Sequence, residues 1–371
     1  MLVQKIQLKK ILNSLGEYTL ECEMSSSSNI VSASVPAGES AGISESIILP
    51  VDTAISKWNT IRENFENKDF TSLEEFDNLL IQLDGTDNKS NLGGNLTLVL
   101  SICFLKLLAK ESNSPLYKYI SENFNFKLNI PTYFLLIFEG GKHGSSFISA
   151  QEYMLLINNI KEGIECIQKI KRYLDTNKLF CGYGLEGAFT SSTFSDIDVL
   201  KFLKLLFPEK QIAIDIAESS RNGEKFNYNE ILNNFNIYSL EDIAKEDDWG
   251  SWVEFNKQFG EKCVVIGDDL TTTNSILIQK AIDQKIIGGV IIKPNQIGTI
   301  TETIKAVKLC KNNNLKVIVS HRGGDTNDDF IADLSIGVGA DFVKFGGLQR
   351  GERICKYNRL EDIKASLVSQ I

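Results

Sequence analysis

Several features that would place the chain in common functional classes are missing from its sequence. No block of basic residues occurs, and the formal net charge is −9 with both signs spread along the chain. This pattern argues against binding to nucleic acid or to an acidic membrane surface. The start, MLVQKIQLKK, lacks the apolar core of a signal peptide. The longest apolar run, LTLVLSICFLKLLA, is too short to cross a bilayer. We therefore expect a cytoplasmic protein.

Cysteine and histidine patterns typical of metal-binding or disulfide-rich proteins are also missing. The seven cysteines are scattered without a CxxC pair, and most lie inside apolar runs, such as Cys103 in LSICFL. The chain has two histidines, His143 and His321. Scattered cysteines of this kind are typical of reduced core residues in a cytosolic protein.

The length and the order of the patterns predict two domains. The chain has 371 residues, of which 43% are hydrophobic, enough for a full buried core. Residues 1–125 begin with three short strand patterns and continue with helical ones, which predicts an N-terminal α+β capping domain. Residues 126–371 form the second domain, where strand patterns alternate with helical patterns.

Six apolar runs in the second domain each end in one polar residue. The runs are QIAIDIA, IYSLEDI, VVIGDD, GVIIKPN, VIVSHR and DFVKFGG, and their polar residues are Asp215, Glu241, Asp268, Lys293, His321 and Lys344. These residues are 23 to 28 positions apart, which leaves room for one helix between strands. Two further strands are expected at PTYFLLIFEGG and AQEYMLLI, and NKLFCGYGLEGAF is a strand or a loop. The pattern predicts an α/β fold with a (β/α)8-type barrel, whose functional residues follow the strands.

The polar residues that end the first three runs suit a divalent cation. Asp215, Glu241 and Asp268 are hard oxygen ligands, and three carboxylates with open positions favour Mg²⁺. The alternative is that each acidic residue caps the helix that follows its strand. Three in succession, followed by two lysines, favour the metal site.

The basic residues at the later strand ends suggest a base and an anion-binding site. Lys293 and Lys344 would point into the barrel mouth, where burial and nearby positive charge should lower their pKa and make a general base feasible. The alternative is an exposed lysine at each strand end. His143 and His321 flank glycine-rich turns, and Arg322 beside exposed backbone N–H groups is suited to bind phosphate or carboxylate.

Two glutamates and one loop complete the candidate site. Glu186 lies in the glycine-rich GYGLEGAF, and Glu152 lies in AQEYM. As a pair they could form a proton relay in which one pKa is raised for general-acid work. The loop SVPAGESAG has the composition of an active-site lid.

These residues lie in motifs that resemble the enolase family over nearly the whole chain. The matching stretches are SVPAGESAG, LDGTDNKSNLGGN, GGKHG, QEYM, LEGAF, AIDIAES, SLEDIAKEDDW, GDDLTTTN, IIKPNQIGTITET, VSHRGGDTNDDFIADLSIG, VKFGG and GERICKYNRL. The resemblance implies an enolase-type barrel with a smaller cap. It also implies the Mg²⁺-dependent dehydration of 2-phosphoglycerate to phosphoenolpyruvate, a hydro-lyase reaction of glycolysis.

The resemblance also implies a role for each matching residue. The ligands of the first Mg²⁺ would be Asp215, Glu241 and Asp268. Lys293 would be the base and Glu186 the acid, with Glu152 beside it. Lys344 would bind the substrate carboxylate, and Arg322, next to His321, the phosphate. His143 would belong to a mobile loop, and Ser40 to a lid that helps hold a second, substrate-dependent Mg²⁺. The family's homodimer is a further expectation.

Some positions depart from the family pattern. The serine after the His–Arg pair is Gly323, and an asparagine is replaced by Glu139. The other departures are Leu185, Ala188, Ile243, Pro294, Glu39 and Leu15. Because Leu185 is apolar, we expect it to raise the pKa of the neighbouring Glu186. These changes leave two alternatives open: an enolase-like lyase or isomerase acting on another 2-hydroxy or phosphonate acid, and a non-catalytic paralog that binds a partner.

Overall fold

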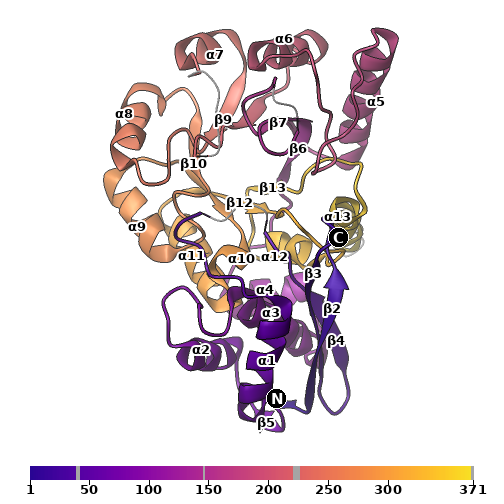
Figure 1. Ribbon diagram of the computed structural model, residues 1–371, viewed down its shortest axis with the longest axis vertical. Helices are drawn as coiled ribbons and strands as arrows, with labels where there is room; N and C mark the ends of the chain where they lie inside the picture. The colour runs from indigo at the N-terminus through magenta and orange to yellow at the C-terminus, as the bar shows by residue number, and fades with distance from the viewer. Residues whose placement is uncertain (39–41, 145–146, 220–225, 369–371) are drawn as a thin grey trace.

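The computed structural model describes residues 1–38, 42–144, 147–219 and 226–368. Figure 1 shows an elongated molecule with a barrel at one end and a smaller group of helices and strands, formed by the N-terminal part of the chain, at the other. The predicted combination of a barrel with an α+β cap is therefore confirmed. The boundary near residue 125 stays a prediction, although it falls between α4 (Leu116–Phe124) and β6 (Thr132–Glu139).

The N-terminal part combines a sheet with a group of helices. The strands β2 (Lys5–Leu12), β3 (Tyr18–Ser25) and β4 (Ile30–Ser34) form an antiparallel sheet in that order. A two-stranded sheet pairs β1 (Leu2–Val3) with β5 (Lys68–Asp69). The helices are α1 (Val51–Ile61), a 3-10 turn (Arg62–Asn64), α2 (Leu73–Asp84), α3 (Gly94–Glu111) and α4. Helix α3 is buried along most of its length because it carries apolar side chains on every face.

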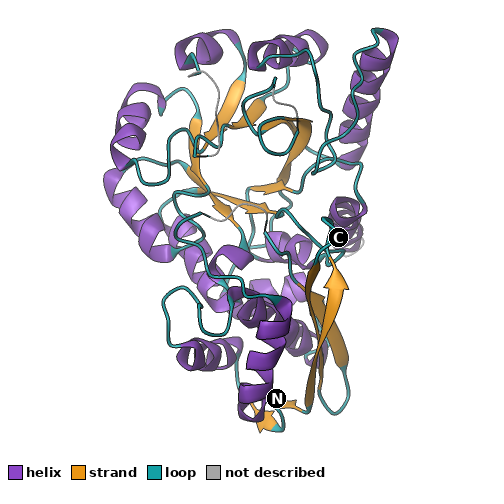
Figure 2. Ribbon diagram, viewed as in Figure 1, coloured by secondary structure: helices purple, strands orange, loops and turns teal. Residues whose placement is uncertain are grey.

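Eight of the described strands close the barrel, which is visible as a ring of arrows in Figure 2. In chain order they are β6, β7 (Glu152–Ile157), β8 (Ile212–Asp215), β9 (Ile237–Glu241), β10 (Val264–Gly267), β11 (Gly289–Ile292), β12 (Lys316–Ser320) and β13 (Phe342–Lys344). The helices of this part are α5 (Ile160–Thr176), α6 (Asp196–Leu206), α7 (Tyr228–Asn234), α8 (Trp249–Phe259), α9 (Ser275–Gln284), α10 (Pro294–Ile297), α11 (Ile300–Asn312), α12 (Phe330–Gly337) and α13 (Gly351–Val368).

One strand departs from the parallel arrangement of an ordinary (β/α)8 barrel. Strand β7 runs antiparallel to both β6 and β8, whereas the other neighbouring pairs are parallel. The short connection of residues 140–151 contains no helix among its described residues, and β7 returns beside β6 in the opposite direction. The segment 177–189, expected as a strand or a loop, is a loop that touches β6 through an isolated bridge between Phe138 and Phe189.

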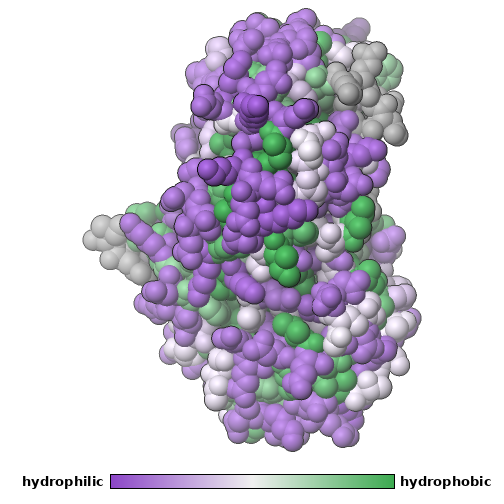
Figure 3. Space-filling model, turned by 90° about the vertical axis from the view of Figure 1, so that its left-hand side faces the viewer, coloured by the Kyte–Doolittle hydropathy of each residue, from purple (hydrophilic) through white to green (hydrophobic). Residues whose placement is uncertain are grey.

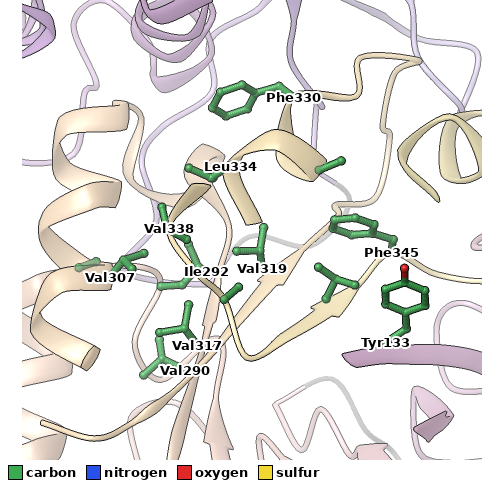
Figure 4. Close-up of a cluster of buried hydrophobic side chains, with 14 of the residues drawn as sticks. Tyr133, Val290, Ile292, Val307, Val317, Val319, Phe330, Leu334, Val338 and Phe345 are labelled. Atoms are coloured by element: carbon green, nitrogen blue, oxygen red, sulfur yellow. The ribbon is translucent and has the colours of Figure 1, made fainter. Parts of the chain in front are cut away.

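The side chains of the barrel strands alternate between two apolar cores. The inner core contains Ile291 and Ile318, together with Phe134, Leu136, Met154, Ala188, Ala213, Ile266 and Phe342. Their neighbours Val290, Ile292 and Val319 point outward and pack against α11 and α12, as Figure 4 shows. This alternation fixes which strand residues can face the barrel mouth.

The cap places one of its loops beside the carboxyl ends of the barrel strands. The N–H of Gly38 donates to the Gly323 carbonyl at 3.1 Å, and the N–H of Ile43 donates to Glu246 Oε2 at 2.9 Å. Farther from the mouth, Lys106 of α3 forms an ion pair with Asp328 at 2.8 Å. The contacts of Gly38 and Ile43 hold the segments on either side of the lid centre against the barrel.

One face of the molecule is mainly polar. Figure 3 shows a face on which hydrophilic residues predominate and hydrophobic ones form separate patches. In the described ranges, we find no helix that combines the length and the apolar character needed to span a bilayer.

Candidate active site

The barrel brings the predicted polar residues to one end because each follows or ends a strand. Asp215, Glu241 and Lys344 are the last residues of β8, β9 and β13. Asp268, Lys293 and His321 directly follow β10, β11 and β12. Since the carboxyl ends of parallel strands meet at one mouth, these six side chains converge there.

A polar cavity lies at this mouth. Its lining includes most of the predicted site residues: His143, Glu152, Glu186, Asp215, Asp268, Lys293, His321, Arg322, Gly323 and Lys344. Glu241 is not part of this lining but contacts Lys344, which is. Ser40 lies outside the described residues, and so does Glu39.

Lys344 lies at the centre of a buried cluster of carboxylates. Its Nζ is 2.9 Å from Asp215 Oδ2, 2.8 Å from Glu241 Oε1 and 3.3 Å from Glu152 Oε2. Burial lowers the pKa of Lys344, but attraction to the three carboxylates outweighs it and holds the pKa well above its usual value. Lys344 is therefore a fixed positive charge in this structure.

The expectation that the two lysines have a lowered pKa is wrong for the protein in this state. Lys293 forms a close ion pair with Asp268. Burial lowers the pKa of Lys293, but the negative charge of Asp268 outweighs it and raises the pKa above the usual value. Burial and positive neighbours do lower the pKa of a lysine, but direct pairing with a carboxylate has the larger effect here.

The predicted metal ligands fit a hard divalent cation by chemistry. Asp215 Oδ1 and Glu241 Oε2 are buried oxygens that lack a hydrogen-bond partner among the described residues. Asp268 accepts a hydrogen bond from Gln296 Nε2 at 2.8 Å as well as pairing with Lys293. Buried carboxylate oxygens without a donor are the groups that a cation such as Mg²⁺ would bind.

The carboxylate oxygens that lie closest together are not those of the three predicted metal ligands. Asp242, Asp268 and Asp269 offer ligand oxygens that all lie within 4.8 Å of one another. In the described part of the chain, Asp215, Glu241 and Asp268 are not such a group. The reason is that Lys344 occupies the space between Asp215 and Glu241, while Lys293 holds Asp268. Burial and neighbouring carboxylates raise the pKa of Asp269 to about 7, so this region would gain stability from a bound cation.

Glu186 lies among positively charged or hydrogen-donating side chains. Its Oε2 is 3.1 Å from His321 Nε2 and 3.9 Å from His143 Nδ1, and its Oε1 is 3.8 Å from Arg353 Nη2. Burial lowers the pKa of His321 to about 4, so this imidazole is neutral near pH 7, with its Nε2 facing the carboxylate.

The expected effect of Leu185 on Glu186 is wrong. Burial raises the pKa of Glu186, but His321, His143 and Arg353 outweigh it and hold the pKa well below its usual value. Leu185 is 37% exposed and contributes little to the burial of its neighbour. Neighbours in space rather than in sequence therefore determine the ionisation of Glu186.

Glu152 and Glu186, predicted as a relay, lie on the same side of the cavity. With His143 they offer ligand atoms that lie within 4.8 Å of one another. Burial raises the pKa of Glu152 well above its usual value, and Glu186 and Asp215 add to this effect. The pair thus combines one carboxyl that favours the protonated form with one that favours the ionised form.

Arg322, the residue predicted to bind an anion, lines the cavity and is buried. Its Nη2 is 2.9 Å from Glu45, a buried residue of the segment that follows the lid. A Cβ built on Gly38 would lie 3.5 Å from the guanidinium, so the start of the lid packs directly on Arg322. Gly323 follows Arg322 in the cavity lining and adds no side-chain donor.

Some residues of the site could not be assigned from the sequence. Asp242 accepts the N–H groups of Asp268 and Asp269 at 3.0 and 2.9 Å. The consecutive acidic residues of SLEDI and GDD were the available signal for it. Arg353 gave no local signal, because only the fold brings α13 under the loop of Glu186.

Glu139 is the most deeply buried of these unassigned residues. Burial and the charge of Glu186 raise the pKa of Glu139 to about 8, although two backbone N–H groups and Arg353 act in the opposite direction. The sequence indicated only that an asparagine of the family pattern is replaced at this position.

Comparisons with known proteins agree with this architecture. The profile described as "Enolase, N-terminal domain" matches residues 3–120, and "Enolase, C-terminal TIM barrel domain" matches residues 191–371. The enolase of Ureaplasma parvum serovar 3 is 35% identical over 98% of this chain and 96% of its own length. The enolases of Campylobacter lari and Helicobacter pylori strain J99 are 33% and 31% identical over 98% of the chain, and 97% and 96% of their own lengths are covered. The chain therefore belongs to the enolase family.

Proposed function

We propose that this chain is a hydro-lyase that converts 2-phosphoglycerate to phosphoenolpyruvate with Mg²⁺. The observation that carries the proposal is the placement of Lys293 and Glu186 on separate walls of one cavity. Lys293 lies against Asp268, whereas Glu186 lies against His321 and Arg353. A base and an acid placed in this way suit an elimination in which the proton and the hydroxide leave from different sides of the substrate.

Two cationic groups would bind and orient the substrate. Lys344 is suited to the carboxylate because it is buried, positively charged and held by three acidic side chains. Arg322 is suited to the phosphate because a guanidinium binds oxyanions through paired hydrogen bonds. His143 and His321 would border the reacting carbon atoms, and Ser40 remains assigned to the lid by resemblance alone.

Asp215, Glu241 and Asp268 would hold the first Mg²⁺, and the family resemblance implies a second ion that binds with the substrate. Bound Mg²⁺ would supply positive charge that stabilises the doubly charged carboxylate formed when the α-proton leaves, and it would replace the lysines as partners of these acids. Lys293 then accepts the α-proton from the carbon beside the substrate carboxylate. Lys293 must be neutral to accept this proton. The ion pair with Asp268 favours the charged form, so the pair has to separate before this step.

Glu186 would complete the reaction by protonating the departing hydroxide, so that water leaves and the double bond forms. In the structure its pKa is low, whereas that of Glu152 is raised. Glu152 is therefore the proton donor from which Glu186 could be supplied, and the two carboxyl groups would act as a relay.

The direct test is turnover of 2-phosphoglycerate by the purified protein with Mg²⁺, measured as the ultraviolet absorbance of the enol ester. Removal of the metal with a chelator should abolish the signal, and added Mg²⁺ should restore it. Turnover of a different 2-hydroxy or phosphonate acid, with none of 2-phosphoglycerate, would instead favour a related lyase or isomerase. An absence of turnover with all of these acids would favour a paralog that binds a partner.

A further inference from the structure

Glu139, the last residue of β6, holds the loop that carries Glu186. Its side chain is completely buried. Glu139 Oε2 accepts the backbone N–H of Glu186 at 2.9 Å, and Oε1 accepts the N–H of Ala188 at 2.6 Å. One carboxyl group therefore accepts hydrogen bonds from the backbone on both sides of Gly187.

The surrounding loops are built closely around this carboxylate. A Cβ built on Gly184 would lie 2.5 Å from Glu139 Oε2, and one built on Gly144 would lie 2.4 Å from the Glu139 carbonyl oxygen. Gly187 has a φ of 82°, a conformation that favours glycine. The loop thus reaches the carboxylate only because glycines allow the close approach.

Other contacts hold the neighbouring atoms of the same loop but leave the Glu186 N–H to Glu139. The N–H of Gly347 donates to the Glu186 carbonyl at 2.9 Å, and Arg350 Nη2 donates to the Gly184 carbonyl at 2.9 Å. These contacts fix the carbonyl side of the loop. Glu139 fixes the N–H side, next to the Cα from which the Glu186 carboxyl extends to His321.

We propose that Glu139 is a positioning residue for Glu186. Its hydrogen bonds to the loop, one through each carboxyl oxygen, set the distance between the Glu186 carboxylate and His321. The inference rests on the proposed function, in which Glu186 assists hydroxide departure. Both carboxyl oxygens keep lone pairs for the two N–H groups, also in the protonated form that the raised pKa favours. An amide could accept only one of the two N–H groups and would turn its NH₂ group toward the other. An alanine would leave both buried N–H groups without an acceptor.

The test compares Glu139→Gln and Glu139→Ala with wild type in dehydration of 2-phosphoglycerate and in exchange of its α-proton in D₂O. We expect kcat for dehydration to fall about 10- to 100-fold in Glu139→Gln and further in Glu139→Ala, the range found for residues that orient a functional group. KM and α-proton exchange should stay within about twofold of wild type, because Lys293 lies on another wall. Unchanged kcat, or equal losses in kcat and exchange, would overturn the inference.

Asp84 provides a matched control in the cap. Its carboxylate is also buried and accepts two backbone N–H groups, those of Thr86 and Leu92 at 3.0 and 2.6 Å. Asp84→Asn should lower stability without separating dehydration from exchange. Separation in this variant as well would show that any loss of a buried carboxylate has the same effect.

A second measurement tests the inference without turnover, so that a failure of the proposed function is distinguishable. The chain has only two histidines, which allows the imidazole NMR signal of His321 to be assigned with a His143 variant. Glu139→Gln should shift this signal because Glu186 moves relative to His321, whereas Asp84→Asn should not. An unshifted His321 signal in Glu139→Gln would contradict the positioning role even if the wild-type protein has no activity on 2-phosphoglycerate.

Discussion

Lys344 Nζ lies 2.8 Å from Glu241 Oε1, and both side chains are almost completely buried. The same ammonium contacts Asp215 and Glu152, so one lysine is shared by three carboxyl groups at the barrel mouth. A substrate carboxylate and a divalent cation would compete for these partners, which links binding of metal and substrate to the stability of the free protein.

Replacement of Lys344 by methionine should destabilise the metal-free protein by about 3–5 kcal/mol, because it leaves buried carboxylates without their positive partner. Added Mg²⁺ should then raise the melting temperature more in this variant than in wild type, since the cation binds acids that no longer have a competing ammonium. Thermal unfolding with and without Mg²⁺ measures both effects.

Lys356→Met is the control for loss of a buried lysine elsewhere. Lys356 is buried and lies 3.1 Å from Asp325, away from the predicted metal ligands. It should lower the melting temperature without increasing the response to Mg²⁺. If both variants respond to Mg²⁺ as wild type does, the predicted metal site is wrong.

The substitution Gly323→Ser should lower KM for 2-phosphoglycerate by up to about tenfold, the equivalent of 1.4 kcal/mol. Gly323 follows Arg322 in the cavity lining, so a hydroxyl there could donate to the phosphate. Gly323→Ala adds a carbon without the hydroxyl and serves as the control. An equal KM in the serine and alanine variants would indicate that no phosphate lies within reach of residue 323.

Asp77 should make the stability of the cap depend on pH. Asp77 Oδ2 accepts hydrogen bonds from Ser101 Oγ and the Thr301 N–H, both at 2.9 Å. Burial raises the pKa of Asp77 from 3.8 to about 6. The folded state therefore binds the proton more tightly, so the stabilisation is fully present below about pH 4 and is lost as the pH rises through about 6.

Urea unfolding of wild type and Asp77→Asn between pH 4 and 7 tests this dependence. The difference of about two pH units corresponds to about 3 kcal/mol. Wild type should lose up to this amount relative to the variant as the pH rises. A constant difference between the two proteins over this range would mean that Asp77 does not titrate there.

The sequence predicted the barrel well because its six later strands each end in one polar residue at regular spacing. The same regularity could not reveal that β7 is antiparallel, although the short connection between Glu139 and Glu152 was visible. Strand direction follows from the length of that connection, not from the pattern within the strand.

The electrostatics of the site could not be predicted from the sequence. Lys293 and Lys344 were expected to have a lowered pKa, and Glu186 a raised one, yet each shift has the opposite direction. In each case the cause is a partner distant in the chain, such as Asp268 for Lys293 or Arg353 for Glu186. Such pairs exist only once the barrel has closed.

The assignment of Lys293 as base and Glu186 as acid makes the two steps separable. Lys293→Ala should abolish both dehydration and α-proton exchange, because the variant lacks the assigned base. Glu186→Gln should lose dehydration by about 10²–10⁴-fold, the range for a positioned acid, yet keep measurable exchange. His321 keeps a hydrogen-bond acceptor in this variant, so the fold of the site should persist.

Proton NMR of 2-phosphoglycerate in D₂O with wild type and each of these two variants tests the central claim most directly. The account predicts loss of the α-proton signal with wild type and with Glu186→Gln, and a persistent signal with Lys293→Ala. Exchange by Lys293→Ala at the wild-type rate would contradict the assignment of the base, and with it the proposed mechanism.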